Sequence, residues 1–281
     1  MRLVERFTTS IDSVPPSDYL TLGAALTEEE ERSPYSSYYR RGPAPIPAEQ
    51  AEALAPGRRL EPSRAFPPEE MARHMLVPHV DIRLSGCCVL PDGTAFGAAW
   101  CDMSAVTQEM EDFFDAHWNP GGDLFYKIWY PGAHVRHYAD AAIESLGREP
   151  EILRVGPAPS LRSMGFPENL TAADPDFLGV RGGNAQLMKL TDREGREKLD
   201  ITLLHFYRRQ GAGKFICTRF WMGLHLDLET GRPVRTLPFY AAVREEAARL
   251  LCVHCAAEYA TNARNMKDFW AEHQELGGGV R

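Results

Sequence analysis

The sequence predicts an α+β fold in which an antiparallel sheet wraps around one long C-terminal helix. Residues 184–190, 199–208 and 215–226 are rich in apolar, β-branched and aromatic side chains and are separated by turn residues, which is typical of an antiparallel meander. From about residue 238 to 273, apolar residues recur at helical spacing with no Gly and no internal Pro. The 281 residues, 44% of them hydrophobic, are enough for one large core.

The first 65 residues are rich in Pro, which predicts loops with short helices at 18–26 and 47–55. A further short helix is expected at 67–75, because Pro residues open it and acidic residues follow. Residues 1–75 are therefore expected to form an N-terminal arm or small subdomain, and residues 76–281 the main domain. The arm's composition hints at packing on the body or on a second copy of the chain, as in a homodimer.

The central elements follow from turn and cap signals. A helix is expected at 104–117 with Ser104 as its N-cap. The run LFYKIWY after Asp123 predicts a strand that ends at a Pro-Gly turn, and residues 134–138 predict another extended piece. Three short extended segments are expected before these, at residues 79–84, 86–90 and 94–101.

Charge and cysteine content limit the class of protein. A formal net charge of -8 disfavours nucleic acid or an anionic membrane surface as the main partner. No stretch approaches the run of about 18 apolar residues that a membrane span needs, and MRLVERFTTS lacks the apolar core of a signal peptide. The six cysteines, two of them adjacent, are expected to be reduced thiols, so a soluble cytoplasmic protein is predicted. The CxxC spacing of Cys252 and Cys255 lies inside a helical pattern, which disfavours a zinc or redox motif.

His254 and Glu258 form the strongest candidate for chemistry. Residues four apart lie on one face of a helix, so an imidazole and a carboxylate could bind one metal ion from adjacent turns. The surrounding residues 250–257 are apolar nearly all round, and buried polar groups need partners. A buried His–Glu hydrogen bond or a solvent-facing pair explains the same spacing without a metal.

A second candidate is the histidine pair His134 and His137, which follows the aromatic run and its Pro-Gly turn. A ligand placed directly after a regular element is held rigidly. Loop histidines without any role fit the same pattern.

The segment YKIWYPGAH resembles the aromatic-rich segment of the 2,4-diacetylphloroglucinol hydrolase and phloretin hydrolase family, and the similarity covers roughly residues 70–275. Enzymes of that family are zinc-dependent and cleave the carbon–carbon bond between an acyl group and a polyhydroxylated ring. The resemblance implies a helix-grip (START-like) catalytic domain, a Zn²⁺ cofactor and a small acylphenol substrate.

The resemblance also implies site residues. Carried over by motif, the four zinc ligands fall on His134, Glu168, His254 and Glu258. His137 is an alternative to His134, and Glu149 and Glu151 are alternatives to Glu168.

The resemblance assigns Tyr126 and His205 to the substrate, and these two residues or His137 would bind phenolic oxygens or deliver a proton. His137 takes the place of a polar amide in the family pattern, and Phe220 and Trp221 stand where a further tyrosine is expected. Phe125 and Trp129 would complete an apolar wall for the ring. A non-catalytic binder of aromatic ligands and a metal-dependent oxygenase are the competing functions.

Overall fold

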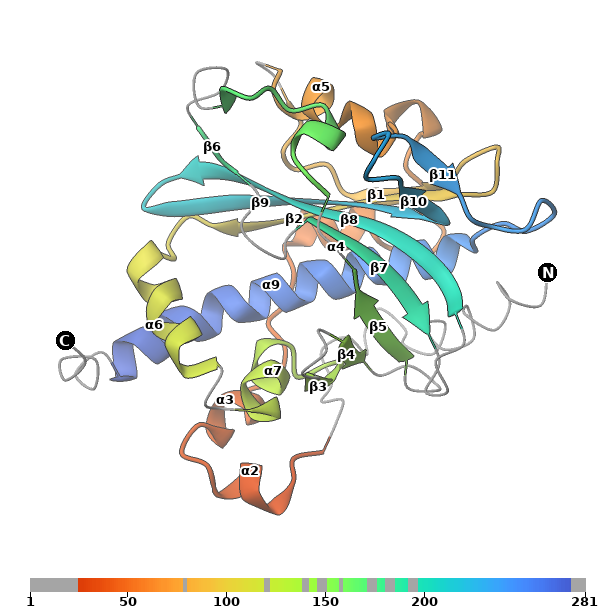
Figure 1. Ribbon diagram of the computed structural model, residues 1–281. Coiled ribbons are helices and arrows are strands. Elements are labelled where there is room, and N and C mark those ends of the chain that lie inside the picture. Colours follow the sequence, from red (N-terminus) through yellow and green to blue (C-terminus); the bar gives the residue numbers. More distant parts are fainter. Residues whose placement is uncertain are drawn as a thin grey trace.

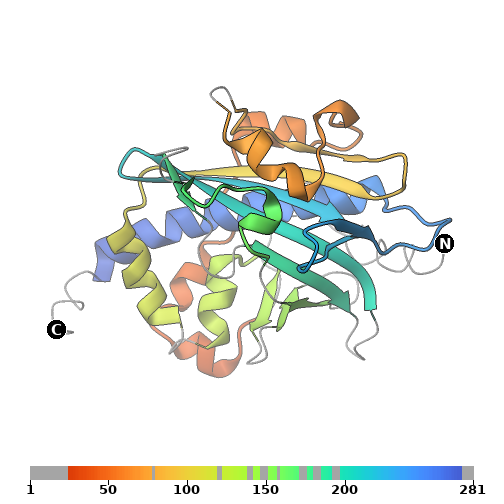
Figure 2. The ribbon, with the colours of Figure 1, turned by 45° about the horizontal axis from the view of Figure 1, so that its top comes forward.

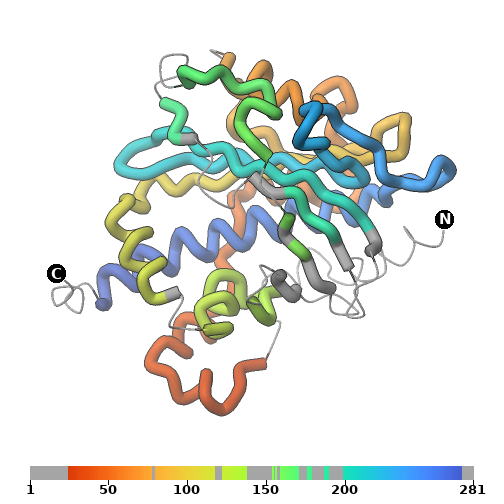
Figure 3. The backbone as a smooth tube through the Cα atoms, viewed as in Figure 1, coloured from red at the N-terminus to blue at the C-terminus, as the bar shows by residue number. Residues whose placement is uncertain are grey.

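The computed structural model describes residues 25–77, 80–118, 122–137, 142–145, 151–156, 159–170, 176–179, 185–191 and 197–273 (Figure 3). Within these residues the fold is a mixed α+β arrangement of an antiparallel sheet and a long C-terminal helix (Figure 1). The predicted helix at 18–26 and the predicted turn at 192–197 lie mostly outside the described residues.

One antiparallel sheet organises the chain, with strand order β1-β2-β9-β8-β7-β5-β4-β3 and β6 as an additional partner of β8. Its strands are β1 (Gly86–Val89), β2 (Ala95–Met103), β3 (His134–His137), β4 (Ala142–Ser145), β5 (Glu151–Val155), β6 (Phe177–Gly179), β7 (Ala185–Thr191), β8 (Glu197–Gln210) and β9 (Gly213–Met222). A separate ribbon pairs β10 (Leu224–Leu226) with β11 (Pro233–Arg235). The predicted meander is confirmed, because β7, β8 and β9 pair in sequence order.

Helix α9 (Glu245–His273) runs along one face of this sheet (Figures 1 and 2). The helix comes very close to β2 at Gly97, where an added Cβ would lie 2.7 Å from Cys252 Sγ. Glycine at this position therefore lets the helix backbone approach the sheet. The 29 residues of α9 span about 44 Å, so one rigid rod connects the ends of the molecule.

Each face of the sheet carries its own apolar core. Between the sheet and α9, one cluster includes Leu203 and Phe220, and α6 (Gln108–Trp118) and α7 (Asp123–Trp129) close it. On the opposite face a second cluster includes Phe206 and Trp221, and α5 (Met71–Met75) covers it (Figure 2). Alternate residues of β8 and β9 point to opposite faces, so register decides which side chains face α9.

The N-terminal segment spans both cores. It carries α2 (Glu28–Arg32), α3 (Ser36–Arg40), α4 (Ala48–Ala53), η2 (Pro62–Arg64) and η3 (Pro68–Glu70). Tyr38 belongs to the cluster under α9, whereas Phe66 belongs to the cluster on the other face. A largely buried ion pair joins Lys127 Nζ of α7 to Glu30 Oε2 at 2.7 Å, which fixes the described part of the arm to the body.

Two helix starts differ from the prediction. Helix α6 begins at Gln108 rather than near Ser104, because the Thr107 hydroxyl accepts a hydrogen bond from the Met110 amide at 3.3 Å and acts as the cap. Helix α9 begins at Glu245 rather than at 238. The Arg235 guanidinium binds the carbonyl oxygens of Pro238 and Ala241 at 3.1 and 2.9 Å, which holds the intervening residues in a turn.

The strand predicted from LFYKIWY is wrong: residues 123–129 form helix α7. Short apolar runs do not distinguish a strand from a buried helix by periodicity. Here Asp123 occupies the first turn, and five consecutive residues from Leu124 to Ile128 are buried. Burial on nearly all sides by α3, α6 and α9 explains why every position is apolar or paired. None of the helices in the described residues combines the length and apolarity that crossing a membrane demands.

Candidate metal centre

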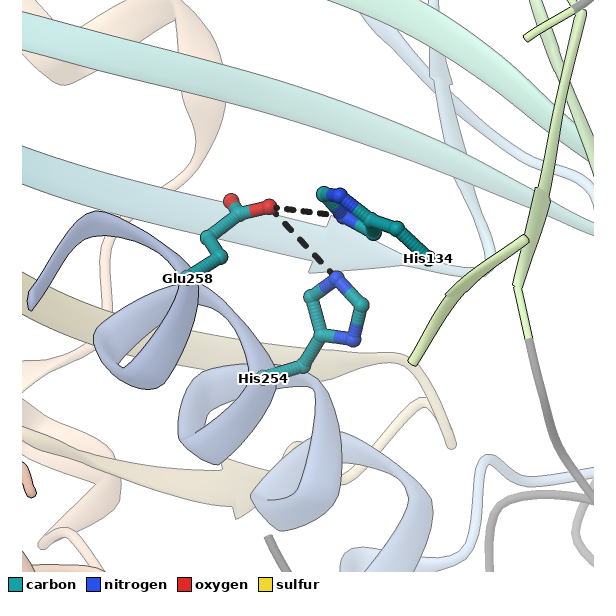
Figure 4. Close-up of side chains that lie close together, drawn as sticks. All are labelled: His134, His254 and Glu258. Carbon is teal, nitrogen blue, oxygen red and sulfur yellow. Dashed lines mark ion pairs between the residues drawn. The ribbon is translucent and has the colours of Figure 1, made fainter. Parts of the chain in front are cut away.

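Three side chains from two distant parts of the chain converge beside α9. Helix α9 presents His254 and Glu258 from adjacent turns, and β3 contributes its first residue, His134 (Figure 4). One ligand atom from each of the three lies within 4.8 Å of the others. The spacing of four on the helix is what places His254 and Glu258 on a common face.

One carboxylate oxygen of Glu258 faces both imidazoles (Figure 4). Its Oε2 is 3.2 Å from His134 Nε2 and 3.5 Å from His254 Nε2. Both histidines thus direct the same ring nitrogen to one carboxylate oxygen. This convergence is the geometry in which two nitrogens and one oxygen can share a cation.

His134 is fixed in orientation by α7. Its Nδ1 lies 3.0 Å from the carbonyl oxygen of Tyr126, and the Tyr126 ring stacks on the imidazole at 4.0 Å with a 6° interplanar angle. A carbonyl oxygen can only accept a hydrogen bond, so Nδ1 carries the proton and Nε2 of the neutral ring keeps its lone pair. A backbone carbonyl that holds the other nitrogen is the usual support of a metal-binding histidine.

The His254 side chain is less enclosed, at 25% exposure, whereas that of His134 is 3% exposed. The Tyr130 ring meets the His254 ring edge to face at 4.9 Å. The two histidine rings lie 5.3 Å apart, so neither blocks the other. The site is consequently closed on the side of His134 and more open on the side of His254.

The pKa shifts of Glu258 and His134 suit a cation. Burial alone would raise the pKa of Glu258, but the neighbouring rings of His134 and His254 lower it to about 2. Burial lowers the pKa of His134, although Glu258 partly offsets the effect. A carboxylate that stays ionised beside a neutral imidazole is the protonation state that metal binding requires.

The donor set fits a divalent transition metal. Two imidazole nitrogens and one carboxylate form the protein ligand set of several catalytic zinc sites, in which a fourth position stays open. The same three donors also form the facial triad of non-haem iron oxygenases. The oriented Nε2 of His134 and the ionised Glu258 are observations on this chain that agree with either metal.

Glu168, predicted as the fourth ligand, is not brought to this cluster. It follows η4 (Arg162–Met164), its side chain is 87% exposed, and its carboxylate lies 3.8 Å from Arg162. Met164 belongs to the core on the face of the sheet opposite α9. Glu168 lies away from the predicted metal site because its loop covers that opposite face. Spacing along the chain does not reveal which face of a sheet a loop covers. Glu149 lies outside the described residues, as does the Glu151 side chain.

His137 is also separate from the three. It ends β3, it is exposed, and its backbone amide donates to Asp123 Oδ1 at 2.9 Å. Its ring meets that of Tyr126 at 5.9 Å. Between His134 and His137 the strand register shifts, so the two side chains do not share one environment. His134 is therefore the histidine of this pair that faces Glu258.

His205 lies on β8, on the face that packs toward α9. Its Nδ1 is 2.8 Å from Thr218 Oγ1, and its ring meets the Tyr259 ring edge to face at 5.0 Å. Burial lowers the pKa of His205 to about 4, so the imidazole is neutral near pH 7. Tyr259 follows Glu258 directly, which places His205 next to the metal-site helix.

The four aromatic residues predicted as a wall do not form one surface. Trp129 meets both His134 and Tyr259 at 6.1 Å between ring centroids. Phe220 lies in the core under α9, whereas Trp221 faces the opposite side of the sheet, where its indole donates to the Phe66 carbonyl. Phe125 packs on Phe269. Strand alternation separates Phe220 from Trp221, so only one of the two can face the site.

Tyr259 and Tyr130 contact the site although neither was predicted. Burial, followed by the charge of Glu258 and a hydrogen bond with Tyr207 among other groups, raises the pKa of Tyr259. The position of Tyr259 directly after Glu258 in the sequence could have indicated that it lies near the site. Tyr130 is at the end of the misassigned aromatic run, so its direction could not be derived from a strand pattern.

Comparison with known proteins agrees with this geometry. The family model described as the DAPG hydrolase PhiG domain matches residues 67–271, which is more than half of the chain. The chain belongs to the DAPG hydrolase family. It is also 26% identical over 262 residues to phloretin hydrolase of Eubacterium ramulus, and the match covers 89% of this chain and 94% of that protein. The matched region contains His134, His254 and Glu258.

Proposed function

We propose that this member of the DAPG hydrolase family is a metal-dependent hydrolase that cleaves the carbon–carbon bond between an acyl group and a phenolic ring. Membership of the family and similarity to phloretin hydrolase support carbon–carbon hydrolysis of phenolic ketones. The convergence of His134, His254 and Glu258 carries the metal part of the proposal. The identity of the metal, zinc, rests on the ligand types and on the family resemblance.

His134, His254 and Glu258 would hold the ion, and a bound Zn²⁺ would polarise the acyl carbonyl and ease the ionisation of water. Tyr126 stacks on His134 and keeps the imidazole in the tautomer that presents Nε2. Trp129 adds an apolar boundary beside His134.

His205 is proposed to bind or protonate the phenolic part of the substrate. Its Nδ1 is engaged with Thr218, so Nε2 is the nitrogen that can exchange a proton. A neutral imidazole can accept a hydrogen bond from a phenol or hand over a proton, depending on its tautomer. Cleavage leaves an electron pair on the ring carbon, and a proton must be delivered to that carbon to form the released phenol.

The decisive experiment compares variants at the site with a matched carboxylate control. His254→Ala and Glu258→Ala should each lose the bound metal and at least about 10²-fold in kcat/KM on an acylphenol, while the far-ultraviolet circular dichroism stays native. Glu168→Ala removes an exposed carboxylate far from the cluster and should keep both the metal and the turnover. Full activity of metal-free Glu258→Ala enzyme would refute the proposal.

A second experiment, turnover without oxygen and in isotopically labelled water, separates the proposed hydrolase from an oxygenase built on two histidines and a carboxylate. Hydrolysis should proceed without oxygen and incorporate oxygen from water into the released acid. Turnover that stops under anaerobic conditions, with iron as the bound metal, would instead indicate the oxygenase.

We further propose that the sheet and α9 form a helix-grip body, as the family resemblance implies. Residues 1–75 would be an arm on a catalytic domain of residues 76–281, in a cytoplasmic homodimer that needs neither nucleic acid nor a membrane. The placement of α9 along one face of the antiparallel sheet supports the first of these points (Figure 1).

A further inference from the structure

Asn262 lies one helical turn beyond Glu258 on α9, and its side-chain oxygen has no hydrogen-bond partner among the described residues. The residue is 3% exposed, and among the described residues nothing donates a hydrogen bond to its buried Oδ1. Buried side-chain oxygens nearly always accept a hydrogen bond, because losing water without replacement is costly. Within the part of the chain that the structure describes, this amide oxygen on the metal-site helix is therefore available to accept a hydrogen bond from a ligand.

Helix geometry indicates the direction of the Asn262 side chain. Four residues advance an α-helix by about 6 Å and rotate it by about 40° relative to the starting residue. The next residue after Glu258, Tyr259, is rotated by about 100° in the same sense. Asn262 therefore points between the directions of Glu258 and Tyr259.

On that side, α9 faces β8 and α7. The Tyr259 ring contacts His205 of β8 at 5.0 Å and Trp129 of α7 at 6.1 Å. Glu258, which belongs to the metal site, lies on the other side of the Asn262 direction from Tyr259. The amide of Asn262 is thus aimed at the region where a ring attached to a metal-bound acyl group would lie.

Asn265, on the same helix, shows the contrasting case. Its Nδ2 donates to the carbonyl oxygen of Ile128 at 2.8 Å, and the residue is fully buried. Asn265 therefore has a structural task in joining α9 to α7. No comparable contact engages Asn262 within the described residues, although the two asparagines differ by only three positions.

We propose that Asn262 binds a ring hydroxyl of the substrate, with the hydroxyl donating to Oδ1. This inference rests on the proposed acylphenol hydrolysis and adds a specificity determinant to it. The rise of about 6 Å from Glu258 to Asn262 along the helix is comparable with the span across a phenol ring. Asn262 would thus select acylphenols that carry a free hydroxyl on the part of the ring remote from the acyl group.

The test pairs Asn262→Leu with Asn265→Leu as the control on the same helix. Leucine has the same branching and number of side-chain heavy atoms as asparagine, although it is bulkier, and it accepts no hydrogen bond. Turnover is measured on an acylated trihydroxybenzene and on each of its monomethyl ethers, together with metal content and the thermal midpoint. Binding of 1,3,5-trihydroxybenzene, which has the ring hydroxyls and no acyl group, is measured by calorimetry.

Asn262→Leu should lower kcat/KM about tenfold on the free phenol, mainly through KM, and weaken binding of the trihydroxybenzene by a similar factor. The loss should disappear for one monomethyl ether. Metal content and thermal midpoint should be retained, because an unpaired buried oxygen is removed. Asn265→Leu should lower the thermal midpoint, since Ile128 loses its donor, without discriminating between the substrates.

Equal losses on the free phenol and all its ethers, or no loss at all, would overturn the role of Asn262. Asn262→Ala provides a second variant if leucine does not fit, and the same ether discrimination is expected of it. If the wild-type protein cleaves no acylphenol yet binds the trihydroxybenzene through Asn262, the proposed function fails and the binding role stands. If the wild type neither cleaves nor binds these compounds, both proposals fail.

Discussion

Acidification should unfold this protein partly through His205, because the folded chain holds that imidazole neutral. Burial lowers its pKa from 6.5 to about 4, and the residue is 5% exposed. The unfolded chain takes up a proton below pH 6.5, whereas the folded chain does so only near pH 4. The contribution of neutral His205 to the free energy of unfolding is therefore fully present above pH 6.5 and is lost as the pH falls toward 4.

The size of this effect follows from the difference between the two pKa values. Each pH unit of that difference corresponds to about 1.4 kcal/mol, so His205 should account for about 3 kcal/mol of the free energy of unfolding between pH 7 and pH 4. Glutamine at position 205 keeps a polar group opposite Thr218 but does not titrate. The His205→Gln variant should accordingly lose less stability on acidification.

Urea unfolding of both proteins at pH 7 and pH 4.5, with a chelator present, measures the difference. Glu258, whose pKa is lowered to about 2, also loses stabilising charge on acidification, but it does so in both proteins and cancels. Wild type should lose about 2 to 3 kcal/mol more than His205→Gln over this interval. Identical pH dependence in the two proteins would refute the assignment of a buried neutral imidazole.

Three further changes test the packing around the site. Lys127→Met should lower the free energy of unfolding in urea by about 2–4 kcal/mol, because the largely buried Glu30 carboxylate loses its partner. Adding Glu30→Gln should restore part of the loss. No recovery in the double variant would contradict the ion-pair explanation. Phe269→Ala should lower the free energy of unfolding by about 3–5 kcal/mol, since the residue is 1% exposed and its ring contacts those of Phe114 and Phe125. A loss below about 1 kcal/mol would show that this cluster is not close-packed. Thr107→Ala should lower the stability of α6 by about 1 kcal/mol, with Ser104→Ala as the nearly neutral control, and the reverse order would restore Ser104 as the cap.

Much of the fold could be predicted because its signals are local. The strands β7, β8 and β9 alternate with clear turns, and α9 has a long uninterrupted helical pattern. The start of α9 could not be predicted, since it depends on Arg235. This residue belongs to the separate β10–β11 ribbon and binds carbonyl oxygens just before the helix. Helix α7 was misassigned because nearly all its sides are buried by other elements, which removes the periodicity.

Residues of the site could likewise be predicted where their signals are local. His254 and Glu258 could be recognised from helical spacing, and His134 from its place after a turn in a segment that resembles a known family. The structure places Glu168 outside the cluster, and the sequence could not reveal this position because the face of the sheet that a loop covers depends on tertiary packing. Tyr259 and Asn262 became apparent only when their neighbours on β8 and α7 were known.

The central claim is that His134, His254 and Glu258 hold one metal ion. Anomalous diffraction at the zinc absorption edge, on crystals of the purified protein, tests it most directly. The account predicts a single peak at about 2.0–2.2 Å from Nε2 of both histidines and from a Glu258 oxygen. The claim would be contradicted by fully active crystals with no peak there, or by a zinc ion bound elsewhere while these three side chains keep their mutual contacts.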